Sequence, residues 1–352
     1  SLRIDAALDE QLIQMLRAKP RRTASGVATV TVLTKPWPCK NDCIYCPNDV
    51  TMPKSYIADE PACQRAERCC FDPYLQVAAR LTTLANMGHN TDKVELIVLG
   101  GTWFDYPQRY RLWFSCQLFA ALDDFGSARM DEEVARRRGA YEALLAEEQE
   151  GRALSERIRC AHVDLQRKVD AGAITYAQAF HELAPLRQRA LPDLDDAPTE
   201  ELLGALQRAN EDARARCVGL VVETRPDTVT CEALAELRAM GVTKVQVGVQ
   251  SLDDAVLDAS ERADRVCDVE RALGLIRVFG FKSHVHMMAN LIGSAPEDDL
   301  RHYRKLMEDA RFKPDEVKLY PCALVESARL TEAFEQGAWA PYGEDELVEL
   351  LS

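Results

Sequence analysis

The fold is restricted most by a series of six short apolar segments, rich in β-branched residues, that alternate with segments of helical periodicity. Short continuous apolar runs of this kind are typical of strands buried on both faces of a parallel sheet. Repeated strand–helix alternation indicates parallel β/α units. The expected strands cover residues 27–34, 94–99, 217–222, 244–249, about 282–291 and 316–320. The sequence therefore predicts an α/β fold, a partial (β/α)6 barrel with a helical insertion after the second unit.

The stretch from about 126 to 210 interrupts this alternation. It is rich in Ala, Glu, Arg and Leu and shows no convincing strand, so we expect charged helices with solvated faces. His162 and His181 lie within it and are expected at the surface. The expected organisation is an N-terminal helix (2–18) and basic linker over 1–26, the partial barrel over 27–125 and 211–335, the insertion over 126–210, and the start of a C-terminal linker over 336–352.

Composition limits the environment and the partners. No stretch approaches the roughly 18–20 consecutive apolar residues of a membrane span, so we expect no membrane partner. Twelve cysteines in 352 residues are too sparse for a disulfide scaffold and favour a reducing, cytoplasmic location. A net charge of −14 argues against indiscriminate nucleic-acid binding. It leaves room for a local basic patch, for which the candidate is the run Arg17, Lys19, Arg21 and Arg22; its simplest interpretation is a solvated linker.

Three cysteines, Cys39, Cys43 and Cys46, follow directly on the first expected strand with the spacing C-x3-C-x2-C. Thiolates suit iron–sulfur clusters or zinc, and this spacing lets one loop wrap one metal centre. Three thiolates on a four-iron cluster leave one iron open to a small molecule. Two alternatives remain: structural zinc, which needs a fourth ligand, and a redox CxxC pair. The nearest candidates for that fourth ligand are Cys63, Cys69 and Cys70.

Polar residues follow the ends of several other expected strands. In parallel β/α barrels these carboxyl ends meet at one mouth, where reactive groups gather. Glu223 and Arg225 either form an ion pair across the mouth or bind a ligand, and His284 and His286, two residues apart, share one strand face. Both histidines have a functional and a purely hydrogen-bonded interpretation. The strand-end groups are Gly100-Gly101-Thr102, Glu223-Thr224-Arg225, Gln250-Ser251 and, less clearly, residues 286–290.

The cysteine spacing, with the aromatic Tyr45 before the last cysteine, resembles the signature of radical S-adenosylmethionine (SAM) enzymes. Longer segments resemble the radical SAM domain of the catalytic subunit of Elongator, in its bacterial or archaeal single-chain form. The resemblance covers nearly the whole chain apart from about 128–205. The matching segments are TKPWPCKNDCIYCPN, FDPYLQ, GHNTDKVELIVLGGTW, CVGLVVETRPD, VQVGVQSLDD, GFKSHVHMM and KPDEVKLYP.

This resemblance implies an enzyme that modifies carbon 5 of the wobble uridine of tRNA and uses acetyl-CoA as acyl donor and co-substrate. A [4Fe-4S] cluster on Cys39, Cys43 and Cys46 would bind SAM and yield a 5′-deoxyadenosyl radical. Lys93 matches a family lysine associated with acetyl-CoA, and the basic run at Arg17, Lys19, Arg21 and Arg22 would contact tRNA. The residues expected to bind SAM are Tyr45, Gly100, Gly101, Thr102, Glu223, Arg225 and Gln250.

The sequence departs from the family pattern in three places. It lacks the phosphate-binding loop R/Q-x-x-G-x-G/A of the family's acetyltransferase half, so we expect either that the chain is a fragment of a longer protein or that this half is absent. The basic N-terminal extension is reduced to the four residues named above, and residues 287–292 replace a proline-containing MMP-L-P pattern. The alternative functions are a radical SAM enzyme with another substrate and a non-catalytic tRNA-binding scaffold with a structural metal. A homodimer is a further possibility.

Overall fold

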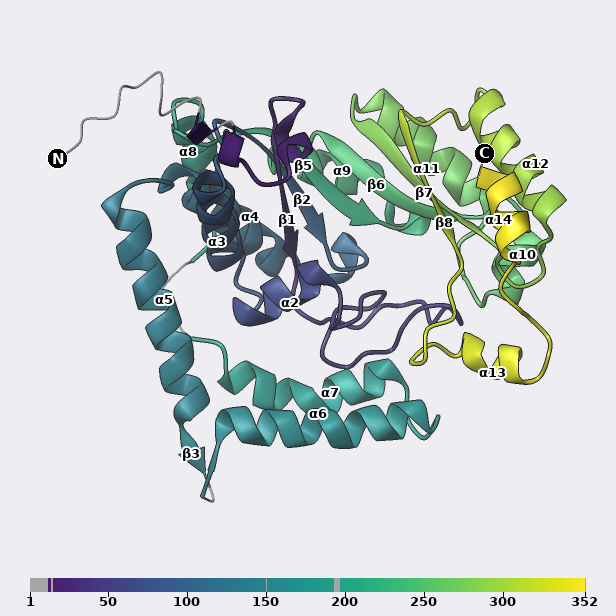
Figure 1. Cartoon of the computed structure of the whole chain (residues 1–352), viewed down its shortest axis with the longest axis horizontal. Helices are drawn as coiled ribbons and strands as arrows, with labels where there is room; N and C mark the ends of the chain where they lie inside the picture. The colour runs from purple at the N-terminus through teal and green to yellow at the C-terminus, as the bar shows by residue number, and fades with distance from the viewer. Residues whose placement is uncertain (1–11, 14, 150, 193–196, 352) are drawn as a thin grey trace.

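A computed structural model describes residues 12–13, 15–149, 151–192 and 197–351 (Figure 1). The helix expected over 2–18 lies largely outside these residues. Six parallel strands form one sheet in the order β1-β2-β5-β6-β7-β8, which is also their order in the chain. The sheet curls into the predicted partial (β/α)6 barrel. Its strands are β1 Ala28–Leu33, β2 Lys93–Leu99, β5 Arg216–Thr224, β6 Lys244–Gln250, β7 Lys282–Ala289 and β8 Glu316–Pro321.

Helices cover the convex face of this sheet. Pro73 opens α3, and the Asp72 carboxylate accepts a hydrogen bond from the Leu75 amide at 3.0 Å, which caps the helix. β7 ends two residues earlier than expected because Asn290 turns the chain with a φ of 64°. The barrel helices are α3 Pro73–Asn86, α4 Gln108–Asp123, α8 Glu200–Asn210, α9 Cys231–Ala239, α11 Val266–Val278 and α12 Pro296–Glu308.

Shorter elements fill the connections. Three are 3-10 turns: η1 Pro20–Thr23, η2 Trp103–Asp105 and η3 Pro226–Thr228. The remaining helices outside the insertion are α2 Pro61–Arg68, α10 Asp254–Ala259, α13 Leu330–Glu335 and α14 Glu344–Leu351.

Side chains alternate between the two faces of each strand, and the two faces differ in chemistry. The outward residues join the helices in one large apolar core; they include Val32, Leu96, Val222, Val247 and Val285. Each such side chain contributes about 1.5–3 kcal/mol when it is fully buried. The inward residues are mostly polar, such as Glu95, Glu223, Gln246, His286 and Lys318. The concave side of the half-barrel is therefore a polar chamber rather than a packed core.

The insertion is helical, as expected, but it also contains a two-strand hairpin, β3 Glu148–Gln149 with β4 Arg152–Ala153. Its helices are α5 Ala128–Ala146, α6 Leu154–Asp170 and α7 Tyr176–Arg189. Helix α8, which falls within the expected range 126–210, packs against α4 as a barrel helix. Buried Arg137 ties α5 to the barrel through an ion pair with Asp72 at 3.1 Å. The α6 and α7 helices lie alongside each other below the loop that follows the cysteines (Figure 1).

The α6–α7 pair packs on residues 48–52, and its charged faces are solvated only on the outer side. The Tyr176 hydroxyl donates to the Met52 carbonyl at 2.7 Å, and the Gln166 amide bonds both the Val50 N–H and the Asn48 carbonyl. His162 is half-buried rather than at the surface: burial and the neighbouring Arg187 charge lower its pKa to about 4. His181 is exposed, as expected.

The structure requires a residue without a side chain at position 100, and this requirement can be tested. A Cβ atom there would lie 1.8 Å from Thr34 Oγ1, and the φ of 141° is one that L side chains rarely adopt. Gly100→Ala is expected to lower the free energy of unfolding by about 2–4 kcal/mol in urea titrations, through overpacking and backbone strain. Gly139→Ala is the control, because that helical site has open space around it. Equal stability of the two variants would contradict this account of Gly100.

Candidate active site

A cavity of about 480 Å³ occupies the concave side of the sheet. All six strands contribute to its wall, and the cysteine loop closes one side with Tyr45 and Cys46. Its volume falls in the range typical of small-molecule sites. The lining residues are Thr31, Tyr45, Cys46, Pro47, Ser55, Tyr56, Glu60, Ile97, Leu99, Glu223, Gln246, Gln250, Arg262, His286, Met288, Lys318 and Tyr320.

Polar side chains in the wall form a hydrogen-bonded network. The Tyr56 hydroxyl donates to Glu223 Oε2 at 2.8 Å, and His286 Nδ1 lies 3.5 Å from Glu223 Oε1. Burial and the Glu223 carboxylate raise the pKa of Tyr56 well above its ordinary value, so the phenol stays protonated. Gln246 Nε2 contacts His284 Nδ1 at 3.2 Å. The two histidines therefore share a face as predicted, but only His286 lines the cavity.

Lys244 closes the other end of the chamber. Its Nζ lies 3.3 Å from Glu95 on β2 and 2.7 Å from Glu316 on β8, so one ammonium group bridges across the curled sheet. Gly219 leaves room for this bridge, because a Cβ there would meet Glu95 Cγ at 3.2 Å. His284 lies 3.5 Å from Glu316. Burial, together with the neighbouring His286, lowers the pKa of His284 to about 4.

The three cysteines lie in one loop, and their thiols differ. A hydrogen bond from the Cys46 thiol lowers the pKa of Cys43 to about 6, and the charge of Arg262 acts in the same direction. Donating that hydrogen bond raises the pKa of Cys46 well above its usual range. Burial raises the pKa of Cys39, which the neighbouring Arg225 partly offsets.

This donor set fits an anionic iron–sulfur cluster, because three sulfurs in one loop are accompanied by two buried guanidinium groups. No group of three His, Cys, Asp or Glu side chains within the described ranges is arranged to hold a single metal ion. The thiols of a cluster bind different irons and need not converge on one point.

Arg262 fixes the cysteine loop against the barrel. It donates to the Tyr45 hydroxyl at 3.0 Å, to Asp264 at 2.8 Å and to the Gly248 carbonyl, and Asn41 donates to the same Asp264 at 3.3 Å. Both charged side chains are buried. Sequence analysis missed this pair; its only signal was two opposite charges two residues apart beside a predicted strand–helix unit.

Arg225 holds Cys39 in place through hydrogen bonds, as Arg262 does for Tyr45. Its Nη1 donates to Cys39 Sγ at 3.2 Å, to Thr102 Oγ1 at 3.0 Å and to Asp105 Oδ2 at 2.9 Å. Of the two alternatives for Glu223 and Arg225, the ion pair between them does not form. Arg225 lies beyond the strand end and pairs with Asp105 and Asp227, while Glu223 points inward to Tyr56.

The other predicted SAM residues fall into two groups. Tyr45, Glu223 and Gln250 line the cavity. Gly100 and Gly101 instead allow close contacts within the chain: a Cβ at Gly101 would lie 3.3 Å from the Lys54 carbonyl, and Gly100 meets Thr34. Gln250 sits at a register shift with a φ of 69°, which turns its side chain toward the cavity wall.

Lys93 and the basic N-terminal run lie away from the cavity. Lys93 is the first residue of β2 and is exposed, whereas the cavity lies toward the carboxyl end of that strand, at Ile97 and Leu99. Arg17 donates to the Gly88 carbonyl at 2.8 Å, just ahead of β2. Lys19, Arg21 and Arg22 are exposed around η1.

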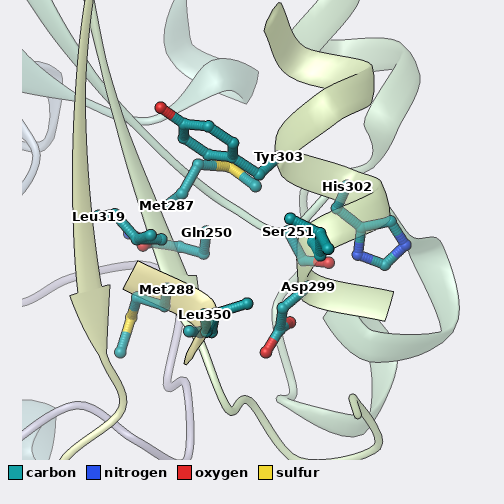
Figure 2. Close-up of a pocket in the computed structure, with 11 residues that line it drawn as sticks. Gln250, Ser251, Met287, Met288, Asp299, His302, Tyr303, Leu319 and Leu350 are labelled. Atoms are coloured by element: carbon teal, nitrogen blue, oxygen red, sulfur yellow. The ribbon is translucent and has the colours of Figure 1, made fainter. Parts of the chain in front are cut away.

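A second cavity of about 300 Å³ lies behind Gln250 and Met288, which line both spaces. Figure 2 shows its wall, with His302 and Tyr303 from α12 and Leu350 from α14. His302 is buried, and burial lowers its pKa.

No family model matches the chain. It is 35% identical over 337 residues to the tRNA uridine(34) acetyltransferase of Dehalococcoides mccartyi, covering 95% of this chain and 57% of that protein. The enzyme of the same description from Methanocaldococcus jannaschii is 32% identical, with coverages of 97% and 51%. The solved structure of Methanocaldococcus infernus Elp3 with its N-terminal residues 1–46 deleted matches with a TM-score of 0.61 and 26% identity, over 93% of this chain and 53% of that one.

The half-barrel and its cysteine loop define a protein of the radical SAM type. Over nearly its whole length the chain is similar to tRNA uridine(34) acetyltransferases and to Elongator complex protein 3, and it spans about half the length of these curated relatives. No helix within the described segments is long and apolar enough to cross a membrane.

Removing the Arg262 guanidinium should loosen the cysteine loop. Arg262→Met leaves Asp264 as a buried, unpaired charge, so we expect the free energy of unfolding to fall by about 3–5 kcal/mol. Arg301→Met, which removes an exposed arginine paired with Asp298, should change it by less than about 1 kcal/mol. Chemical denaturation of both variants measures the difference, and a loss of similar size in both would sink this role for Arg262.

His284 should make stability depend on pH. Its pKa is lowered in the folded state, so its contribution is complete above the ordinary value of 6.5 and is lost as the pH falls toward 4. Between pH 7 and pH 4, His284→Gln should lose about 1–3 kcal/mol less than the unmodified protein. Urea titrations at several pH values test this, with exposed His181→Gln as control. Parallel pH profiles for all three proteins would count against it.

Proposed function

We propose that this chain is a radical SAM enzyme that modifies carbon 5 of the wobble uridine of tRNA. The observation that carries the proposal is the three-cysteine loop at the edge of the barrel cavity, where Cys46 and Tyr45 share a wall with strand-borne polar side chains. Similarity to proteins described as tRNA uridine(34) acetyltransferases supports the choice of tRNA as substrate.

Cys39, Cys43 and Cys46 would hold a [4Fe-4S] cluster, and SAM would be the co-substrate. When bound, the reduced cluster supplies the electron that cleaves SAM. The protein's part is to hold the thiolates, to balance their negative charge with Arg225 and Arg262, and to limit the access of water through the α6–α7 pair packed on the adjoining loop.

The proposed SAM contacts divide by position. Tyr45, Glu223 and Gln250 reach the cavity and are candidates for direct contact with SAM. Arg225 and Thr102 act through Cys39, and so are positioning residues. Gly100 and Gly101 would serve by keeping the β2 end close to Thr34 and Lys54.

The remaining assignments are supported by resemblance alone. We propose acetyl-CoA as the acyl donor with Lys93 as a contact, and tRNA contacts at Arg17, Lys19, Arg21 and Arg22. A cytoplasmic location and a possible homodimer complete the proposal.

The experiment is anaerobic reconstitution of the chain with iron and sulfide, followed by reduction in the presence of SAM. About four irons per chain and release of 5′-deoxyadenosine are expected. Cys43→Ser should lose SAM cleavage at least 100-fold and keep a folded circular-dichroism spectrum, whereas exposed Cys267→Ser should match the unmodified protein. Tightly held zinc without SAM cleavage would contradict the proposal and leave a metal-binding scaffold.

A further inference from the structure

Three side chains in the cavity wall carry polar atoms without a partner among the described residues: Gln246, Gln250 and His286. Gln246 and His286 lie on the neighbouring strands β6 and β7. Gln246 Oε1 and His286 Nε2 accept or donate no hydrogen bond among the described residues. The two residues are 6% and 7% exposed, so these atoms are withdrawn from bulk water. A buried polar group that has no hydrogen-bond partner destabilises the folded state. The fold keeps two such groups side by side on neighbouring strands, beside a cavity that a ligand can fill.

In each of the two side chains, the contact made by one polar atom determines which polar atom is left without a partner. Gln246 Nε2 contacts His284 Nδ1 at 3.2 Å, which leaves the amide oxygen, an acceptor, as the free atom. His286 Nδ1 faces Glu223 Oε1 at 3.5 Å, which leaves Nε2 for a ligand. The register pairs Gln246 with His284 and Gly248 with His286, so the two free atoms belong to adjacent levels of the wall.

The cavity wall also contains an aromatic side chain, Tyr320, on which a planar ligand ring can stack. The Tyr320 ring lies edge-on to His286 with centroids 5.6 Å apart, and both residues line the cavity. Aromatic surface of this kind stacks on nucleobases. Cys46 and Tyr45 close the same cavity, so a ring held here would lie beside the cysteine loop. RNA-binding proteins read bases of single-stranded loops in this way, by stacking and by hydrogen bonds to the base edge.

We propose that Gln246 and His286 are the residues that recognise the substrate base, and that the base is uracil, whose ring N–H donates to Gln246 Oε1. This inference rests on the proposed function and assigns the substrate's recognition to named side chains. Cytosine has no hydrogen on the corresponding ring nitrogen, so Gln246 Oε1 would face a lone pair and the site would reject it. The His284 contact matters because a free glutamine amide could rotate and accept either base.

The test uses the full chain, reconstituted with its cluster and SAM, and two anticodon stem-loop RNAs that differ only in uridine or cytidine at the wobble position. Fluorescence anisotropy measures the dissociation constants. The unmodified protein should prefer the uridine RNA by about tenfold or more, the value of one buried hydrogen bond. Gln246→Ala should bring the ratio to about one, and Gln246→Glu, which keeps an acceptor, should retain most of the preference. Exposed Gln336→Ala is the matched control.

Each outcome bears on the inference separately from the proposed function. Equal affinity of the unmodified protein for both RNAs, absence of binding to either, or a preference that survives in Gln246→Ala would overturn it, even if SAM is cleaved normally. Failure of SAM cleavage in the unmodified protein would instead reject the proposed function. If Gln246→Ala does not fold, His286→Asn and Gln246→Glu decide the question: the first should lose uridine affinity about tenfold and the second should not.

Discussion

The site depends on one buried guanidinium group, that of Arg262. Three otherwise separate parts of the chain meet at it: the cysteine loop through Tyr45, strand β6 through the Gly248 carbonyl, and the turn before α11 through Asp264. A buried charge is tolerated only when its hydrogen bonds are all satisfied. The position of the cysteine loop is therefore linked to the integrity of the barrel, and the loop can present its thiols in a defined place even though it has no regular secondary structure.

The half-barrel differs from a closed (β/α)8 barrel in what fills it. In a closed barrel, layers of branched apolar side chains pack the interior. Here the strand residues of the large apolar core face the helices, and the chamber is lined by polar side chains such as Glu223, Gln246, His286 and Lys318 together with the apolar Ile97, Leu99 and Met288. Lys244, Glu95 and Glu316 satisfy one another at its base, while Gln246 and His286 retain unpaired atoms higher in the wall. Stability and ligand recognition are thus assigned to opposite faces of the same six strands.

The strands could be predicted because runs such as 94–99 combine β-branched residues, a short length and a following glycine. The cysteine loop could be predicted because its spacing is itself the chemical signal. Arg262 and Asp264 could not, since their importance comes from a meeting with residues 41 and 45 that lie more than 200 positions away. Nor did the local sequence show that the Glu223 and Arg225 side chains have different partners. That difference arises because β5 ends at Thr224, between the two residues. The charged composition of α6 and α7 suggested solvated helices and concealed the apolar side that packs on Val50.

Gln250 and Met288 stand between the two cavities, each facing both. Because these side chains line both cavities, the volume of one cavity depends on the volume of the other. Any rotation of Met288 away from the chamber enlarges the space beside the cysteines at the expense of the space beside α12 and α14. Helix α14, whose Leu350 lines the second cavity together with Gln250 and Met288, is thereby mechanically connected to the shape of the reaction chamber.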